Sequence, residues 1–319
     1  MTRIGFHASH EQHAPSSLLE DIAHAERVGF DEAMCSDHLA PWLTAQGQSG
    51  HAWSWLGAAL ALTRFPIGVV TAPGQRYHPV IIAQALATLA DMFPGRAWAA
   101  LGSGEALNEH ITGDEWPPKE QRDERLLAVA DVMRRLLAGE RVDEHGPVRV
   151  HEAKLWSLPE TPPPLLAAGI SVRTAAMVAP WADGLITVGA DPRATAQTRT
   201  AYRDAGGRGD ALLQIHISLE ETDDRALSAA REQWAQATVA PQLMWELSSP
   251  DEFEAHADPT DEKLRAAVVV GSDAADVADR IAAAAVGYDR VFLHQVGRDQ
   301  RRFLDRCERE LLPLLRERL

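Results

Sequence analysis

Histidine and carboxylate side chains recur where short apolar runs of this sequence end. The first run ends near His7 and Glu11, and the second ends at Asp37 and His38. An imidazole changes charge near neutral pH, so His38 is a candidate proton acceptor or donor. Adjacent strand residues point to opposite faces, so Asp37 and His38 serve one site only if the strand has just ended. The alternative is a hydrogen-bonded core imidazole beside a capping aspartate.

A turn with two glycines follows the fourth apolar run. It reads Gly102-Ser103-Gly104-Glu105, and Asn108 follows about one helical turn later. Glycine lets the backbone approach a ligand closely. The full G-x-G-x-x-G dinucleotide pattern is absent, so the turn alone is a weak indication of a ligand. Glu105 also suits the first turn of a helix, where the helix dipole stabilises a carboxylate.

Trp42 precedes a glycine-containing loop, Gly47–His51, that suits a lid over a site. A metal hydrolase is the rival class, because barrels with histidines at strand ends often bind zinc. His7 and His10 lack the alternating spacing that a strand presents to one ion, and no H-E-x-x-H run occurs. We therefore expect no metal site.

Apolar runs alternate with helical patterns along the whole chain. Eight runs predict strands: Arg3–Ser9, Phe30–His38, Pro66–Ala72, Ala97–Gly104, Leu165–Gly169, Gly184–Ala190, Ala211–Leu219 and Asp289–Gly297. Apolar spacings of three and four predict helices between them, including Ser16–Gly29, Trp53–Thr63, Pro79–Phe93, Lys119–Leu137, Pro192–Ala205 and Gln300–Leu319. Such alternation requires parallel strands with helices outside the sheet.

Eight strand–helix units predict an α/β fold, a (β/α)8 TIM barrel with insertions, whose reactive groups lie at the carboxyl ends of the strands. An open doubly wound sheet is the alternative, but no glycine-rich dinucleotide fingerprint follows the first strand. We expect the surplus residues to form two excursions, a hairpin at about 140–164 and a segment at about 238–275 that holds a strand-like run at 266–271. We expect one barrel domain over residues 1–319.

Composition limits the partners. The 319 residues carry 31 Lys and Arg against 46 Asp and Glu, a formal net charge of −15. Nucleic acids and anionic membranes need clustered cations, so both are disfavoured. Two cysteines do not form a disulfide scaffold, and no apolar stretch approaches the ~20 residues of a membrane span. The first 20 residues do not resemble a signal peptide, and we expect a cytoplasmic protein.

Four runs resemble a known family. They are FHASHEQ (6–12), SDHLAPW (36–42), RYHPVIIAQA (76–85) and LGSGEALNE (101–109). These runs resemble the luciferase-like flavin and deazaflavin oxidoreductases, and within them the branch of deazaflavin-dependent glucose-6-phosphate dehydrogenase. The resemblance spans nearly the whole chain and is weakest between residues 205 and 285.

The resemblance implies an isoalloxazine-type ring at the carboxyl end of the barrel. His38 matches the base for the substrate hydroxyl, Trp42 an indole that steadies the intermediate, Glu105 a carboxyl beside the ring and Glu11 a nearby acid. The residues that match cofactor-binding positions are Asp37, Val69, Val70, Gly102, Ser103, Gly104, Asn108, Ala168 and Gly169. The Val69–Val70 link matches a non-proline cis peptide bond of the family.

The chain departs from the sugar-phosphate enzymes after the sixth predicted strand. They carry Thr-Ser-x-Lys where this chain has Val188, Gly189, Ala190 and Asp191, which disfavours glucose 6-phosphate as substrate. The chain looks closer to a sister group with MCSDH, GQSG and EALNEHITG, a group thought to use FMN.

We therefore expect an FMN-dependent oxidoreductase or monooxygenase acting on a small organic substrate. Its partners would be a separate flavin reductase and a second copy in a homodimer. One alternative is an alcohol dehydrogenase that depends on coenzyme F420, in which His38 takes the hydroxyl proton. A second alternative is a non-catalytic flavin-binding protein. Residue chemistry does not separate the two rings.

Overall fold

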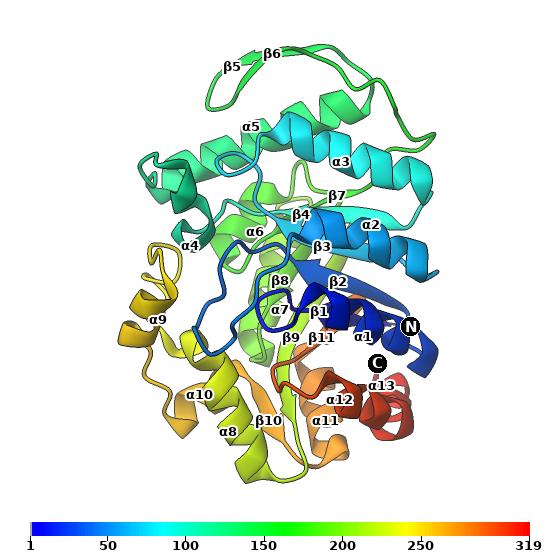
Figure 1. Ribbon diagram of the computed structural model, residues 1–319, viewed down its shortest axis with the longest axis vertical. Coiled ribbons are helices and arrows are strands. Elements are labelled where there is room, and N and C mark those ends of the chain that lie inside the picture. Colours follow the sequence, from blue (N-terminus) through cyan, green and yellow to red (C-terminus); the bar gives the residue numbers. More distant parts are fainter. Residues whose placement is uncertain (1) are drawn as a thin grey trace.

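Eight parallel strands form a closed ring in the computed structural model, which describes residues 2–319 (Figure 1). The ring order is β9-β11-β1-β2-β3-β4-β7-β8, and pairing of β8 with β9 closes it. The strands are β1 (Arg3–Ala8), β2 (Glu32–Ser36), β3 (Ile67–Thr71), β4 (Ala97–Leu101), β7 (Leu165–Ala168), β8 (Gly184–Val188), β9 (Asp210–Leu219) and β11 (Arg290–Gln295). The ring confirms the predicted (β/α)8 barrel and excludes the open sheet.

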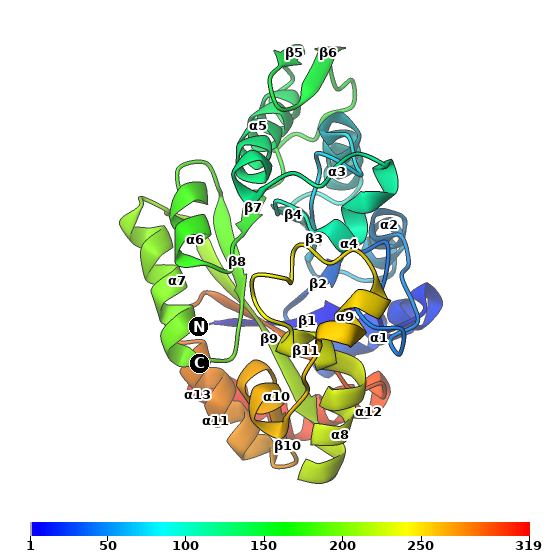
Figure 2. The same cartoon turned by 90° about the vertical axis from the view of Figure 1, so that its left-hand side faces the viewer.

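Helices cover the outside of this ring (Figures 1 and 2). Those between successive ring strands are α1 (Pro15–Val28), α2 (Ala52–Leu62), α3 (Pro79–Met92), α4 (Ala106–Glu109), α5 (Lys119–Leu137), α6 (Val172–Val178), α7 (Pro192–Asp204), α8 (Asp223–Trp234), α9 (Pro250–His256), α10 (Asp261–Ala267) and α11 (Ala274–Ala284). Their ends follow local signals: Gly29 ends α1 with a φ of 101°, and proline begins α1 and α3.

The last predicted helix, Gln300–Leu319, is not continuous. It divides into α12 (Gln300–Arg306), a π-helical turn at Cys307–Leu311 and α13 (Leu312–Arg318). Pro313 lies just after the turn and lacks the N–H that would bond to residue 309 in a regular helix. The wider π-turn accommodates this missing hydrogen bond.

The aromatic rings of Trp98 and Phe292 fill the floor of the barrel, and each packs against a glycine on the neighbouring strand. A Cβ atom on Gly68 would lie 2.0 Å from the Trp98 indole, and one on Gly5 would lie 2.4 Å from the Phe292 ring. These glycines therefore make room for the two rings, whose centroids lie 5.9 Å apart. The floor is apolar and packed, so a ligand can enter the barrel only above it, at the strand ends.

Two segments extend beyond the ring. Strands β5 (Val142–His145) and β6 (Arg149–Ala153) pair antiparallel and project from the body after α5 (Figure 2). In the second segment α9 and α10 precede β10 (Val269–Gly271), which pairs with β9 outside the ring. This second segment forms an apolar cluster with Trp42 from the β2–α2 loop, and so positions that indole at the barrel mouth.

Candidate active site

His38 lies between two carboxylates at the ends of β1 and β4. Its Nε2 atom is 3.3 Å from Oε1 of Glu11 and 3.1 Å from Oε1 of Glu105. Strand β2 ends at Ser36, two residues before His38, so the alternation of a strand no longer holds the imidazole away from this side. The structure thus brings His38, Glu11 and Glu105 into direct contact.

Asn108 fixes the orientation of His38. The backbone N–H of Leu39 donates to Asn108 Oδ1 at 2.7 Å, and a backbone N–H can only donate, so Nδ2 faces the other way. Asn108 Nδ2 donates to Glu105 Oε1 at 2.5 Å and lies 3.2 Å from His38 Nδ1. Nδ1 is then the acceptor, and a neutral His38 carries its proton on Nε2, toward the glutamates.

The two glutamates have opposite electrostatic environments. Burial alone would raise the pKa of Glu11, but the charge of His38 and a hydrogen bond from Ser36 outweigh it and lower the pKa to about 2. Ser9 donates a second hydrogen bond to the same oxygen as Ser36, at 2.9 Å. Burial raises the pKa of Glu105, and its contacts with His38 and Asn108 offset this only in part. Two carboxylates with separated pKa values suit acid–base chemistry.

Asp37 lies in a second polar network, beside β3. Thr71 donates to its Oδ2 at 2.7 Å, and Tyr77 donates to its Oδ1 at 3.3 Å. Arg76 Nη2 donates to the Asp37 carbonyl at 3.0 Å and lies 3.5 Å from Oδ2. The network holds the Asp37 carboxylate in one orientation at the barrel mouth.

Glu109 is a site residue that the sequence reasoning missed. It accepts the Arg76 backbone N–H at 2.6 Å, and Oε1 lies 3.7 Å from Arg76 Nε. Burial raises its pKa to about 7 although Arg76 opposes this change. Arg76 and Glu109 both lie in runs that carried the family resemblance, RYHPVIIAQA and LGSGEALNE, but no spacing rule connects them.

A half-buried wall of small and apolar residues lies at the ends of β3, β4 and β7. Val70, Gly102 and Ala168 stay partly accessible although the strand residues before them are buried. A Cβ on Gly102 would lie 3.8 Å from the Ala168 Cβ, an ordinary van der Waals contact, so the two residues adjoin in this wall. Ser103 and Gly104 continue it toward α4, and Gly104 has a φ of +83°.

Two predicted cofactor-binding residues, Val69 and Gly169, border this wall but do not present a side chain to it. The Val69 side chain is fully buried in the core between strands and helices, so only its backbone faces β2 and β4. Gly169 donates its N–H to the Ile186 carbonyl at 2.9 Å, which leaves it at the edge of the wall, before the α6 cap Ser171.

The expected cis bond between Val69 and Val70 is wrong for this structure. No peptide bond among residues 2–319 is cis. Both valines are within β3, paired with β2 on one side and β4 on the other, and trans peptides keep both ladders regular.

Trp42 completes one side of the mouth. Its ring centroid lies 4.9 Å from that of His38 and 5.0 Å from that of Phe253 in α9, which it meets edge-on. The indole therefore packs between the imidazole and the excursion at about 238–275, where it can touch a ligand held at His38.

Among residues 2–319, no group of three or more His, Cys, Asp or Glu side chains has an arrangement that could hold a metal ion. No helix within these residues is both long and apolar enough to cross a membrane.

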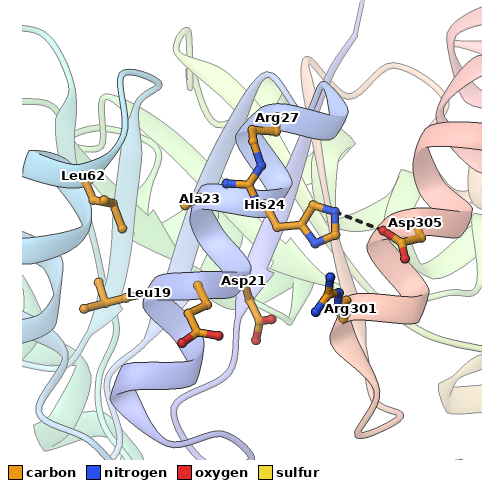
Figure 3. Close-up of a pocket in the computed structure, with 9 residues that line it drawn as sticks. Leu19, Asp21, Ala23, His24, Arg27, Leu62, Arg301 and Asp305 are labelled. Atoms are coloured by element: carbon orange, nitrogen blue, oxygen red, sulfur yellow. Dashed lines mark ion pairs between the residues drawn. The ribbon is translucent and has the colours of Figure 1, made fainter.

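A cavity of about 520 Å³ lies away from the mouth, in the outer helical layer (Figure 3). His24 on α1 forms an ion pair with Asp305 on α12 at 3.1 Å across it. The lining residues are Leu19, Glu20, Asp21, Ala23, His24, Arg27, Leu62, Arg301 and Asp305. All lie on α1, α2 or α12 rather than at a strand end, so this cavity is separate from the candidate site.

Residues 1–290 match the family model described as luciferase-like monooxygenase. The chain therefore belongs to the luciferase-like family, and the protein is an oxidoreductase. The F420-dependent glucose-6-phosphate dehydrogenase of Microbacterium testaceum (strain StLB037) is 35% identical over 330 residues. That alignment covers 99% of this chain and 98% of the relative.

Solved structures agree with the fold. An F420-dependent secondary alcohol dehydrogenase in complex with an F420-acetone adduct has a TM-score of 0.91 and 30% identity, over 98% of this chain and 99% of that one. The EDTA monooxygenase of Chelativorans sp. BNC1 has a TM-score of 0.72 and 14% identity, over 99% of this chain and 94% of that one. At that identity the likeness extends to the fold alone.

Proposed function

We propose that the protein is a dehydrogenase that oxidises a small alcohol with coenzyme F420. The observation that carries this proposal is the cluster in which Glu11 and Glu105 meet Nε2 of His38, next to the half-buried wall. Relatives named for F420-dependent dehydrogenation support the choice of cofactor. A bound deazaflavin supplies a hydride acceptor.

The residues of the wall fit a flat ring. Val70, Gly102 and Ala168 offer small, partly accessible side chains, and Ser103, Gly104 and Gly169 extend the wall with backbone groups. Asp37 is fixed at its border by Thr71 and Arg76, and Val69 would contribute its backbone. Because both polar atoms of Asn108 already bond to protein groups, we assign it to positioning His38 rather than to holding the ring.

The imidazole–carboxylate cluster acts as one acid–base unit. When the His38 imidazole is neutral, its Nε2 carries a proton and Glu11 is ionised, so the atom free to accept a proton is a carboxylate oxygen. The hydroxyl proton of the substrate passes to this unit as its carbon loses a hydride. His38 then donates to the substrate oxygen and orients it, and Trp42 closes the site above the imidazole.

The loop after β8 argues for an uncharged alcohol over a sugar phosphate. The Asp191 carboxylate accepts the N–H groups of Arg193 at 2.9 Å and Ala194 at 2.8 Å. These amides at the start of α7 would otherwise be available to an anion, and Asp191 adds a negative charge of its own. A phosphate dianion is disfavoured there.

An FMN-dependent oxidoreductase or monooxygenase is the second candidate. The MCSDH, GQSG and EALNEHITG runs of the FMN sister group favour it, and reduced FMN can activate oxygen. An FMN-dependent enzyme of this kind would require a separate flavin reductase as electron donor, whereas an F420-dependent dehydrogenase would not. Under either reading we expect a homodimer.

Equilibrium titration with F420 and with FMN, each oxidised and reduced and followed by fluorescence, tests the proposal. We expect tight F420 binding, weak FMN binding and F420 reduction by secondary alcohols but not by glucose 6-phosphate. Tight FMN binding with oxygen uptake would replace the proposal with the FMN reading. Binding of neither cofactor would reject both.

A further inference from the structure

Three histidines form a row across the barrel mouth, on the side away from the proposed ring-binding wall. His7, His294 and His216 lie on the neighbouring strands β1, β11 and β9, and His294 is directly paired with His216 in the strand register. Ring centroids are 4.5 Å apart for His7 and His294 and 5.0 Å for His216 and His294. The Trp234 indole packs against both His216 and His294, at 4.6 Å and 4.5 Å.

A backbone carbonyl sets the proton positions in this row. Gln12 Nε2 donates to the Val296 carbonyl oxygen at 2.9 Å, and a carbonyl oxygen can only accept. The amide oxygen of Gln12 therefore faces His294 Nε2, at 2.8 Å. His294 must donate this hydrogen bond, so its Nε2 carries a proton.

The next hydrogen bond transmits this arrangement to His216. Burial lowers the pKa of His216 to about 3 and the pKa of His294 well below its ordinary value, so both rings are neutral at pH 7. A neutral His294 with a proton on Nε2 has a bare Nδ1, which lies 2.9 Å from His216 Nδ1. His216 Nδ1 must then donate, which leaves His216 Nε2 unprotonated.

The His216 ring can be reached from the mouth. His216 stays partly accessible, whereas His294 and Trp234 behind it are buried. Its strand β9 lies across the ring of strands from β3, which carries Val70 of the wall. His216 therefore lies on the side of the barrel opposite Val70.

We propose that His216 Nε2 accepts a hydrogen bond from the substrate and selects alcohols that carry a second O–H donor, such as vicinal diols. This inference rests on the proposed function, because it names the class of alcohol that the site takes. A ring bound at the wall would cover Val70 and Ala168, so an acceptor on the opposite side distinguishes a diol from a monoalcohol of similar size. A site that pairs a substrate hydroxyl discriminates strongly against analogues that lack it.

The first test needs no cofactor. Nitrogen-15 NMR of the full-length protein labelled at histidine, with the His216 signals assigned from His216→Gln, reports which ring nitrogen is protonated. We expect His216 protonated on Nδ1 alone from pH 5.5 to 8, with its Nε2 signal shifted by cyclohexane-1,2-diol and not by cyclohexanol. A proton on Nε2, or equal responses to diol and monoalcohol, would overturn the inference.

The second test uses the F420-loaded enzyme. We expect kcat/KM to favour propane-1,2-diol over propan-2-ol, and cyclohexane-1,2-diol over cyclohexanol, by about 10- to 100-fold. His216→Phe should remove this preference and leave F420 affinity unchanged, while His216→Gln, which keeps an acceptor, should retain part of it. Equal use of both alcohols by the unaltered enzyme would refute the inference and leave the proposed function intact. A diol-specific NMR shift without F420 binding would refute only the proposed function.

Discussion

At the scale of single residues, the chemistry of the site depends on surrounding residues that give two similar carboxylates, Glu11 and Glu105, different pKa values. Glu11 receives hydroxyl hydrogen bonds from Ser9 and Ser36, whereas Glu105 receives one amide hydrogen bond from Asn108. Burial raises the pKa of Glu105, whereas at Glu11 the charge of His38 and the Ser36 hydroxyl outweigh burial and lower the pKa, although both carboxylates contact the same imidazole nitrogen. His38 thus lies between a firmly ionised acid and one that takes up a proton more readily.

Removing the His38 imidazole should slow alcohol oxidation without weakening the binding of F420. We expect His38→Ala to lower kcat for alcohol oxidation by about 10²- to 10⁴-fold, because a positioned proton-transfer group contributes that much. F420 affinity should change little, since the wall residues are untouched. Stopped-flow absorbance and fluorescence titration measure the two quantities.

His24→Ala is the matched control, because His24 lies on α1 beside the outer cavity. It should leave kcat unchanged. Unaltered kcat in His38→Ala would remove His38 from the proposed acid–base unit.

At the scale of elements, the end of β2 matters more than its length. The apolar run predicts a strand as far as His38, but pairing with β3 stops at Ser36. The last two residues leave the ladder, and so both Asp37 and His38 can join the site. Helix α5, by contrast, matches its predicted bounds because its periodicity and the following Gly139 are local signals.

Helix α1 carries a carboxyl whose environment costs stability. Burial, then the charges of Glu20 and Asp299, raise the pKa of Asp21 to about 6. A raised carboxyl pKa destabilises the folded state fully above pH 6, and the penalty declines to nearly zero as the pH falls toward 4. Asp21→Asn should therefore raise the free energy of unfolding at pH 7.5 by roughly 1–2 kcal/mol, allowing for partial solvent screening.

Urea denaturation at pH 7.5 and at pH 4 measures this difference. The gain should disappear at pH 4, where Asp21 is protonated in the folded protein. Asp305→Asn, on the opposite side of the cavity, should not show the same pattern. A gain that is equal at both pH values would contradict the assignment to the Asp21 charge.

At the scale of the whole molecule, ring closure gathers uncharged histidines from distant segments. Burial lowers the pKa of His7, His10 and His13 to about 4, and that of His216 to about 3. Each folded pKa lies below the ordinary value near 6.5, so the stability that these residues contribute is complete above pH 6.5 and is lost as the pH falls toward 4.

We therefore expect the free energy of unfolding to fall by at least a few kcal/mol between pH 7 and pH 5. The carboxyls with raised pKa values act in the opposite direction and reduce this fall; they are Asp21, Glu32, Glu105, Glu109 and Glu220. Guanidinium denaturation at several pH values measures the slope. Constant stability from pH 7 to pH 5 would mean that the histidines are protonated in the folded protein.

The sequence by itself determined the alternation of strands and helices and the residue types at the strand ends. Periodicity, proline at helix starts and glycine at helix ends act over a few residues, so they are readable without the fold. The barrel class and the residues Glu11, His38 and Glu105 as site candidates came from these patterns together with the family resemblance.

Only the tertiary structure decided which groups meet. Ring closure by β8 and β9, the turn of Asn108 toward His38 and the hydrogen bond between His216 and His294 join residues far apart in the chain. Such contacts depend on strand register and on the packing of distant segments, which no local pattern specifies. The proton positions at His38 and His216 follow from those contacts, and so the proposed chemistry of the site depends on the fold.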